Sequence, residues 1–223
     1  DNRLASFFGR LQYDFKGKYL LSGLVRRDGA SDFAPQNRTD YFSSVTAGWK
    51  LSDENFLKDS NTINFLKLRG SYGNLGNNAG GDLYRALLTG EATYVFDGSL
   101  VSGVATGRIP TPDSVWESAE KLDIGLDINL LDNKIEITTD YFVEDRNRLL
   151  ISNLPVSGIV GASAPGAGLP TANAGSTRNK GIEFFINYKE SFSENLKFGI
   201  SYNVTKIVGE VIDVKANIIS EDG

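Results

Sequence analysis

The sequence predicts an all-β protein, an antiparallel meander of about eight long strands that forms part of the wall of a transmembrane β-barrel. Apolar and polar residues alternate with a period of two in eight places, which is the pattern of strands whose two faces meet different surroundings. The runs extend over roughly 10–15 residues, whereas strands of globular proteins cluster near 5–6. Shorter and longer connections also follow one another in strict alternation along the chain.

Four of the runs lie in the N-terminal part of the chain. In the first, apolar side chains recur on one face from Ala5 to Phe15, and in the second from Tyr19 to Val25. The third extends from Tyr41 to Leu51 and the fourth from Leu66 to Tyr72. The pair Lys16-Gly17 separates the first two runs and suits a tight hairpin turn that needs positive φ angles.

The four runs in the second half of the chain alternate more regularly. The clearest extends from Leu122 to Leu130 and, after the turn signal Asp132-Asn133, the alternation resumes from Ile135 to Val143. Two further runs extend from Ile182 to Tyr188 and from Leu196 to Val204. No pattern with a helical period of 3.6 competes with these strands, apart from one short turn around Glu54–Lys58.

The lengths of the connections indicate a membrane barrel. Three short links and one of medium length, Asp53–Asn64, should lie at one end of the sheet; the short links are Lys16-Gly17, Asp132-Asn133 and Ser193–Asn195. Three long links should lie at the other end: Asp28–Asp40, Leu75–Val115 and Ser152–Thr177. Outer-membrane barrels have short periplasmic turns and long extracellular loops, and their apolar side faces lipid while the polar side lines a wet lumen.

Aromatic residues on the apolar face gather near the short-turn end. These residues are Tyr13, Phe15, Tyr19, Trp49 and Tyr188. Amphipathic rings favour the level of the lipid headgroups, so the group resembles the aromatic girdle of a membrane protein. The alternative is that the rings belong to the core of an ordinary β-sandwich.

Composition excludes several classes of function. The chain has 223 residues and contains neither Cys nor His, which removes thiolate metal sites, disulfides and the commonest general base. Its net charge is −5 and its basic residues are scattered, so we expect no nucleic-acid partner. Carboxylate pairs such as Asp123 with Asp127 follow from the polar parity of a strand, so we expect no enzyme activity, metal or cofactor.

Several blocks of the sequence resemble SusC/RagA-type TonB-dependent outer-membrane transporters. The resemblance rests on 26–31 (RRDGAS), 41–59 (YFSSVTAGWKLSDENFLKD), 66–77 (LKLRGSYGNLGN), 115–150 and 173–188 (NAGSTRNKGIEFFINY). It implies a 22-stranded barrel with an internal plug in the bacterial outer membrane, surrounded by outer-membrane lipid. It also implies a TonB complex as energy source, a SusD-like surface lipoprotein as lid, and import of an oligosaccharide or peptide.

Eight strands are too few for such a barrel. We therefore expect residues 1–223 to be a partial barrel wall from the C-terminal half, with the plug domain and the remaining strands absent from this chain. Two alternatives remain open, a complete small outer-membrane barrel and a soluble β-sandwich, either acting as a binding or structural module.

The longest connection contains the candidate ligand-binding residues. They are Tyr84, Arg85, Tyr94, Phe96 and Asp97. Aromatic rings with a few polar groups suit the capture of a sugar or peptide at the mouth of a channel, and binding residues concentrate on loops. The alternative is that these rings pack within the loop or against the lid protein.

Overall fold

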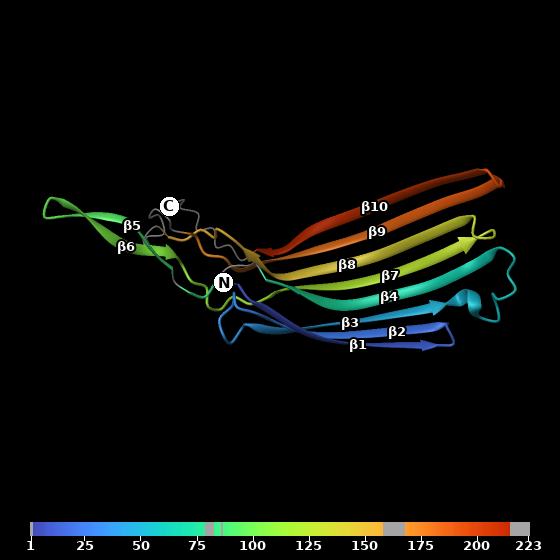
Figure 1. Ribbon diagram of the computed structural model, residues 1–223, viewed down its shortest axis with the longest axis horizontal. Helices are drawn as coiled ribbons and strands as arrows, with labels where there is room; N and C mark the ends of the chain where they lie inside the picture. The colour runs from blue at the N-terminus through green and yellow to red at the C-terminus, as the bar shows by residue number, and fades with distance from the viewer. Residues whose placement is uncertain (1, 79–82, 86, 158–167, 215–223) are drawn as a thin grey trace.

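The computed structural model describes residues 2–78, 83–85, 87–157 and 168–214. Eight strands form one antiparallel sheet in the order β1-β2-β3-β4-β7-β8-β9-β10 (Figure 1). Their bounds are β1 Leu4–Phe15, β2 Tyr19–Ala30, β3 Thr39–Lys50, β4 Ile63–Asn77, β7 Glu117–Leu130, β8 Ile135–Ile151, β9 Ala172–Ser193 and β10 Leu196–Val214. Consecutive strands of this sheet are neighbours throughout, so the predicted eight-stranded meander is confirmed.

Three of the four connections at one end of the sheet are tight turns, while the connections from β4 to β7 and from β8 to β9 at the other end are long (Figure 1). The expected sorting has one exception, because the 12 residues between β3 and β4 at the short-turn end outnumber the 8 between β2 and β3 at the other end. At the short-turn end, Lys16 and Gly17 have φ angles of 57° and 66°, which form the tight turn between β1 and β2. Asp132 and Asn133 adopt 57° and 61° between β7 and β8. The connection from β3 to β4 contains a single short 3-10 helix, η1 Leu51–Asp53. Within the described ranges, no helix has the length and apolar character required to cross a membrane.

One face of the sheet is apolar and open. A register row across it joins Phe15, Tyr19, Trp49, Leu68 and Leu126. Large apolar side chains on this face remain exposed, and Ile200, for example, keeps 59% of its surface. A β-sandwich would enclose these residues between two sheets, so the sandwich alternative is wrong.

The sheet is also open at its sides. The end strands β1 and β10 do not pair with each other in the described structure, so the sheet does not close into a small barrel. The apolar face must meet hydrocarbon and the polar face a lumen. The chain therefore forms part of a larger barrel, and the structure covers only this arc of it.

The predicted girdle lies at the short-turn end of the apolar face. Tyr13 stacks on Phe15 with 6.4 Å between ring centroids, and Tyr19 lies 6.3 Å from both Phe15 and Trp49. Tyr188, on β9, makes an edge contact with Phe198 at 6.4 Å. The rings form a row along the membrane-facing side instead of a closed core.

Glu54, just after η1, ties the girdle to the neighbouring turn. Its carboxylate accepts hydrogen bonds from Tyr19 Oη at 2.7 Å, from Trp49 Nε1 at 3.0 Å and from Lys18 Nζ at 3.4 Å. These donors stabilise the ionised carboxylate and hold the pKa of Glu54 below its usual range, the Tyr19 hydroxyl contributing most. The polar tips of the rings are thereby satisfied at the level where the membrane meets water.

The sequence analysis missed one pair of strands. β5 Leu87–Phe96 and β6 Ser99–Arg108 form a separate two-stranded hairpin inside the long connection that was expected to be a loop. The hairpin extends away from the long-loop end of the sheet (Figure 1). Asp97 and Gly98, with φ angles of 48° and 73°, form its turn.

The last three strands of the sheet are longer than the first three. β1 has 12 residues, β8 has 17 and β9 has 22. The additional residues lie toward the long-loop end, where 144–148 (EDRNR) of β8 and 176–180 (STRNK) of β9 are polar on both faces. In that region Arg178 forms a bidentate pair with Asp145, whose closest distances are 2.5 and 2.8 Å.

Candidate functional site at the lumen wall and long-loop end

The polar face of the sheet carries a charge cluster centred on Arg69 of β4. Its guanidinium contacts Asp140 of β8 through two nitrogens, at 2.7 and 2.8 Å. It also lies 3.2 Å from Asp127 and 3.6 Å from Asp123, both on β7. One cation thus links three strands and faces three carboxylates.

Gly125 makes this reach possible. It occupies the same register row as Arg69 and Asp140, on the strand between them. A Cβ atom at Gly125 would lie 2.5 Å from Arg69 Cζ and would overlap Asp140 Oδ1. The absence of a side chain therefore leaves the space in which the guanidinium crosses β7.

A small hydrophobic core lies at the base of the long loops. Its members are Ala30, Phe33, Phe42, Leu83 and Trp116, with Leu150 packed against them. The indole of Trp116 lies 5.4 Å from the Phe33 ring and 5.7 Å from the Phe42 ring, the second contact being edge-on. Since these residues come from four segments far apart in sequence, the core fixes the long connections to the end of the barrel wall.

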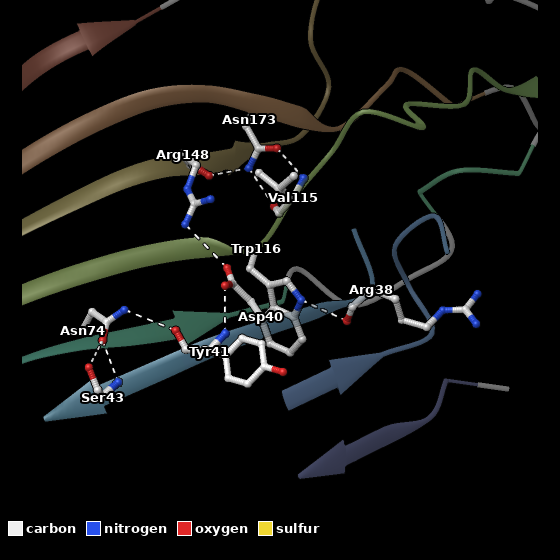
Figure 2. Close-up of polar contacts among 9 residues, drawn as sticks. All are labelled: Arg38, Asp40, Tyr41, Ser43, Asn74, Val115, Trp116, Arg148 and Asn173. Atoms are coloured by element: carbon white, nitrogen blue, oxygen red, sulfur yellow. Dashed lines mark hydrogen bonds and ion pairs between the residues drawn. The ribbon is translucent and has the colours of Figure 1, made fainter. Parts of the chain in front are cut away.

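Hydrogen bonds between side chains and backbone reinforce this core, as Figure 2 shows. Asn173 accepts a hydrogen bond from Val115 N at 2.8 Å and donates to Val115 O at 2.9 Å. It donates a further bond to Arg148 O at 2.6 Å. Trp116 Nε1 donates to Arg38 O at 3.2 Å. The side chains of Asn173 and Trp116 thereby bind backbone groups of three different segments at the loop base.

Polar side chains also join the strands where they diverge (Figure 2). The pairing of β3 with β4 ends at Ser44, and beyond it the Asn74 carboxamide accepts from Ser43 N at 2.7 Å and donates to Tyr41 O at 3.4 Å. Arg148 lies in a bulge of β8 with a φ of 58°, and its guanidinium is 3.7 Å from Asp40 on β3. Bulges redirect side chains, and this one joins two strands that are not neighbours.

The structure separates the five predicted ligand-binding residues into two groups. Tyr84 lies at the loop base, where Arg38 Nη2 donates to its hydroxyl at 3.3 Å and the guanidinium of Arg85 lies 5.1 Å from its ring centroid. Tyr94, Phe96 and Asp97 lie on the β5–β6 hairpin. Tyr94 and Phe96 are 54% and 75% exposed, and the Tyr94 ring covers Gly103 of the opposite strand.

Sequence reasoning missed the residues that build the mouth. Trp116 was recognised only as part of a family block, and the contributions of Phe33, Arg38 and Asn173 were not anticipated. The Asp97-Gly98 pair, a strong hairpin signal, could have revealed the hairpin. In the part of the chain that the structure describes, no three His, Cys, Asp or Glu side chains gather as metal ligands.

Comparisons with known proteins agree with this architecture. The model of the family "TonB dependent receptor-like, beta-barrel" matches residues 1–220. The TonB-dependent receptor P3 of Formosa agariphila is 35% identical over 213 residues, which are 93% of this chain and 21% of the relative. The TonB-dependent receptor SusC of Bacteroides thetaiotaomicron is 34% identical over 210 residues, 92% of this chain and 20% of the relative.

Solved structures show the same arc of wall. The RagAB peptide importer in its closed-closed state matches with a TM-score of 0.83 at 25% identity, over 95% of this chain and 22% of that one. The siderophore receptor PirA of Pseudomonas aeruginosa shares the fold, with a TM-score of 0.61 at 15% identity over 94% of this chain and 35% of that one. The chain spans about a fifth of the length of the curated relatives it matches. It belongs to the TonB-dependent receptor-like β-barrel family of the bacterial outer membrane.

Proposed function

We propose that this chain forms part of the barrel wall of a TonB-dependent importer, which moves a nutrient, an oligosaccharide or a peptide, across the bacterial outer membrane. The observation that carries the proposal is the pairing of a lipid-facing apolar face with a charged lumen face in a chain of this family. Members of this family are transport proteins, so the chain serves transport and not catalysis. Residues 1–223 supply wall, while the plug and the remaining strands belong to other parts of the protein.

The long-loop end of the sheet, where side-chain contacts hold the loop bases in place, supports a role in ligand capture. The core around Trp116 and the bonds of Asn173 hold the loop bases in place. The hairpin beyond them presents exposed Tyr94 and Phe96. A rigid base with aromatic side chains beyond it is the arrangement that loop-borne binding sites use.

Within this proposal, Tyr84, Arg85, Tyr94, Phe96 and Asp97 contact the ligand or the lid. The two groups of residues act at different places, Tyr84 and Arg85 near the rim and the other three on the hairpin. The lid is a SusD-like lipoprotein, a partner class supported by the two-component RagAB match. The TonB complex supplies energy through parts of the protein outside this chain.

Uptake by the full-length protein tests the proposal. A strain lacking the transporter is complemented with wild type, with Tyr94→Ala plus Phe96→Ala, or with Phe192→Ala. Phe192 is a matched control, since it is also an exposed aromatic residue (68%) but lies at the short-turn end of β9. Fluorescent starch oligosaccharides and a fluorescent tryptic peptide mixture serve as probes.

Wild type and Phe192→Ala should take up one probe class, and the double variant should lose uptake by about tenfold, as expected for two lost aromatic contacts. Unchanged uptake in the double variant contradicts the role of the hairpin. Recovery of the wild-type protein as a soluble species without detergent contradicts the transporter assignment itself.

A further inference from the structure

The apolar face contains a hollow of about 830 Å³ near the short-turn end. The rings of Tyr13, Tyr19 and Trp49 border it on one side, and Ile124 borders it on the other. The hollow is open to the side and lined mostly by apolar atoms. It lies directly beside the girdle, and Arg69 of the lumen cluster is among the residues at its floor.

The hollow exists because two adjacent positions lack large side chains. One register row contains Leu21, Ala47, Gly70 and Ile124 in that order. The two smallest residues, Ala47 and Gly70, are therefore neighbours between two large side chains. A Cβ atom at Gly70 would meet only the backbone oxygen of Asp123, at 3.8 Å, which is ordinary contact. The space above Gly70 is therefore empty of protein, and no packing requirement within the sheet explains the glycine.

A basic group without an ion-pair partner lies at the same end. Lys18 and Lys50 pair with Glu54 and Asp53, at 3.4 and 3.0 Å. Lys16, in the β1–β2 turn, forms no ion pair with any described residue, and its Nζ lies 5.2 Å from the Phe15 ring centroid. Since Phe15 stacks between Tyr13 and Tyr19, the ammonium group is one ring away from the hollow.

We propose that this hollow binds an acyl chain of one phospholipid of the periplasmic leaflet, with the Lys16 ammonium contacting its phosphate. The apolar face meets hydrocarbon and the rings mark the headgroup level, so an acyl chain entering beside Tyr19 places its phosphate at the height of the turn. The positive charge of Lys16 complements that phosphate, in the way that basic residues at a membrane surface attract anionic groups. An apolar protein segment would fill the hollow but would supply no negative charge to pair with Lys16.

Native mass spectrometry of the full-length detergent-solubilised protein tests the proposal. The probes are palmitoyl-oleoyl phosphatidylethanolamine and palmitoyl-oleoyl glycerol, which lacks the phosphate. Wild type should retain one phospholipid. Gly70→Val should lower retention by about tenfold, the equivalent of roughly two displaced methylene groups. Lys16→Gln should weaken phospholipid retention about fivefold and leave diacylglycerol retention unchanged.

Gly23→Val is the matched control. Gly23 belongs to the same apolar face but lines a separate hollow of about 640 Å³, and nothing approaches its added Cβ within 4 Å. Gly23→Val therefore tests whether retention depends on the hollow beside Lys16 or on any hollow of this face. Heat-modifiable migration in gels verifies folding of each variant, and Ala47→Leu replaces Gly70→Val if the latter does not fold. The proposal is overturned if Gly70→Val retains as much phospholipid as wild type, or if Gly23→Val loses as much as Gly70→Val. Recovery of a bound protein instead of a phospholipid also overturns it.

Discussion

Substitution of Gly125 by alanine tests the account of the lumen charge cluster. The added methyl group overlaps Asp140 Oδ1 and lies 2.5 Å from Arg69 Cζ, so the guanidinium must leave its position above β7. Arg69 then loses its bidentate contact with Asp140, at 2.7 and 2.8 Å, and its approach to Asp127 at 3.2 Å. Asp123 and Asp140 then lose their cation, while Asp127 still lies opposite Lys67 in the register of β4 and β7.

The loss of stability depends on how far the Arg69–Asp140 ion pair is buried from water. The side chains of Arg69 and Asp140 are 28% and 13% exposed, between a surface ion pair and a buried one. Surface pairs contribute about 0–1 kcal/mol, and breaking a buried pair costs about 3–5 kcal/mol. We therefore expect Gly125→Ala to lower the free energy of unfolding by about 2 kcal/mol, close to a thirtyfold change in the folding equilibrium.

Urea unfolding of the full-length protein in detergent, followed by tryptophan fluorescence, measures this cost. Gly199→Ala is the control, because Gly199 also lies on the lumen face and its added Cβ meets only Tyr188 O, at 3.8 Å. That variant should change the free energy by less than about 0.5 kcal/mol. The same alanine at position 125 should also become nearly neutral once Arg69→Met and Asp140→Ala have removed the two crowded side chains. An undiminished cost in that background refutes the proposed mechanism.

Two further predictions concern the ends of the sheet. Because hydrogen bonds depress the pKa of Glu54, its stabilising contribution is present above the pKa of the unfolded chain and is lost as pH falls through the lower folded value. The fluorescence of Trp49, taken as the difference between the full-length protein and its Trp49→Phe variant, should stay constant from pH 7 down to the ordinary pKa of a glutamate and change only below it. Glu54→Gln should abolish this transition, and an identical transition in both proteins would contradict the assignment. At the other end, Asn173→Ala removes three hydrogen bonds and should lower the local free energy of unfolding by about 2–3 kcal/mol. Hydrogen exchange around Val115 should become faster, without a change near the short turns. Protection equal to that of wild type would show that Asn173 does not hold the loop in place.

The sheet could be predicted from sequence because the membrane imposes a simple pattern. A strand between lipid and water alternates strictly, so runs such as Leu122 to Leu130 reveal both the strand and its two faces. The girdle could be predicted for the same reason, since Phe15, Tyr19 and Trp49 lie near short turns and share one face. Register follows once the turns are placed, because each tight turn fixes the pairing of the strands it joins.

The mouth could not be predicted in the same way. Phe33 and Trp116 are buried among loops, where no period marks them, and their contact depends on how segments far apart in sequence meet. Arg69 and Asp140 are separated by 71 residues, and only the register of three strands shows that Gly125 lies between them. The division of the candidate residues between the loop base and the hairpin likewise arises from tertiary structure alone.

The lengthening of β8 and β9 locates the outer surface of the bilayer on this chain. The rung that pairs Val143 with Lys180 separates a segment with polar side chains on both sides from one that alternates. From Lys180 down to the ring of Tyr188, β9 covers a distance that matches the roughly 9–11 residues a tilted strand needs to cross hydrocarbon. The described residues of β8 and β9 beyond that rung, including Arg178 and Asp145, lie outside the hydrocarbon layer. Within this arc, the wall therefore extends further past the hydrocarbon layer at β8 and β9 than at β1.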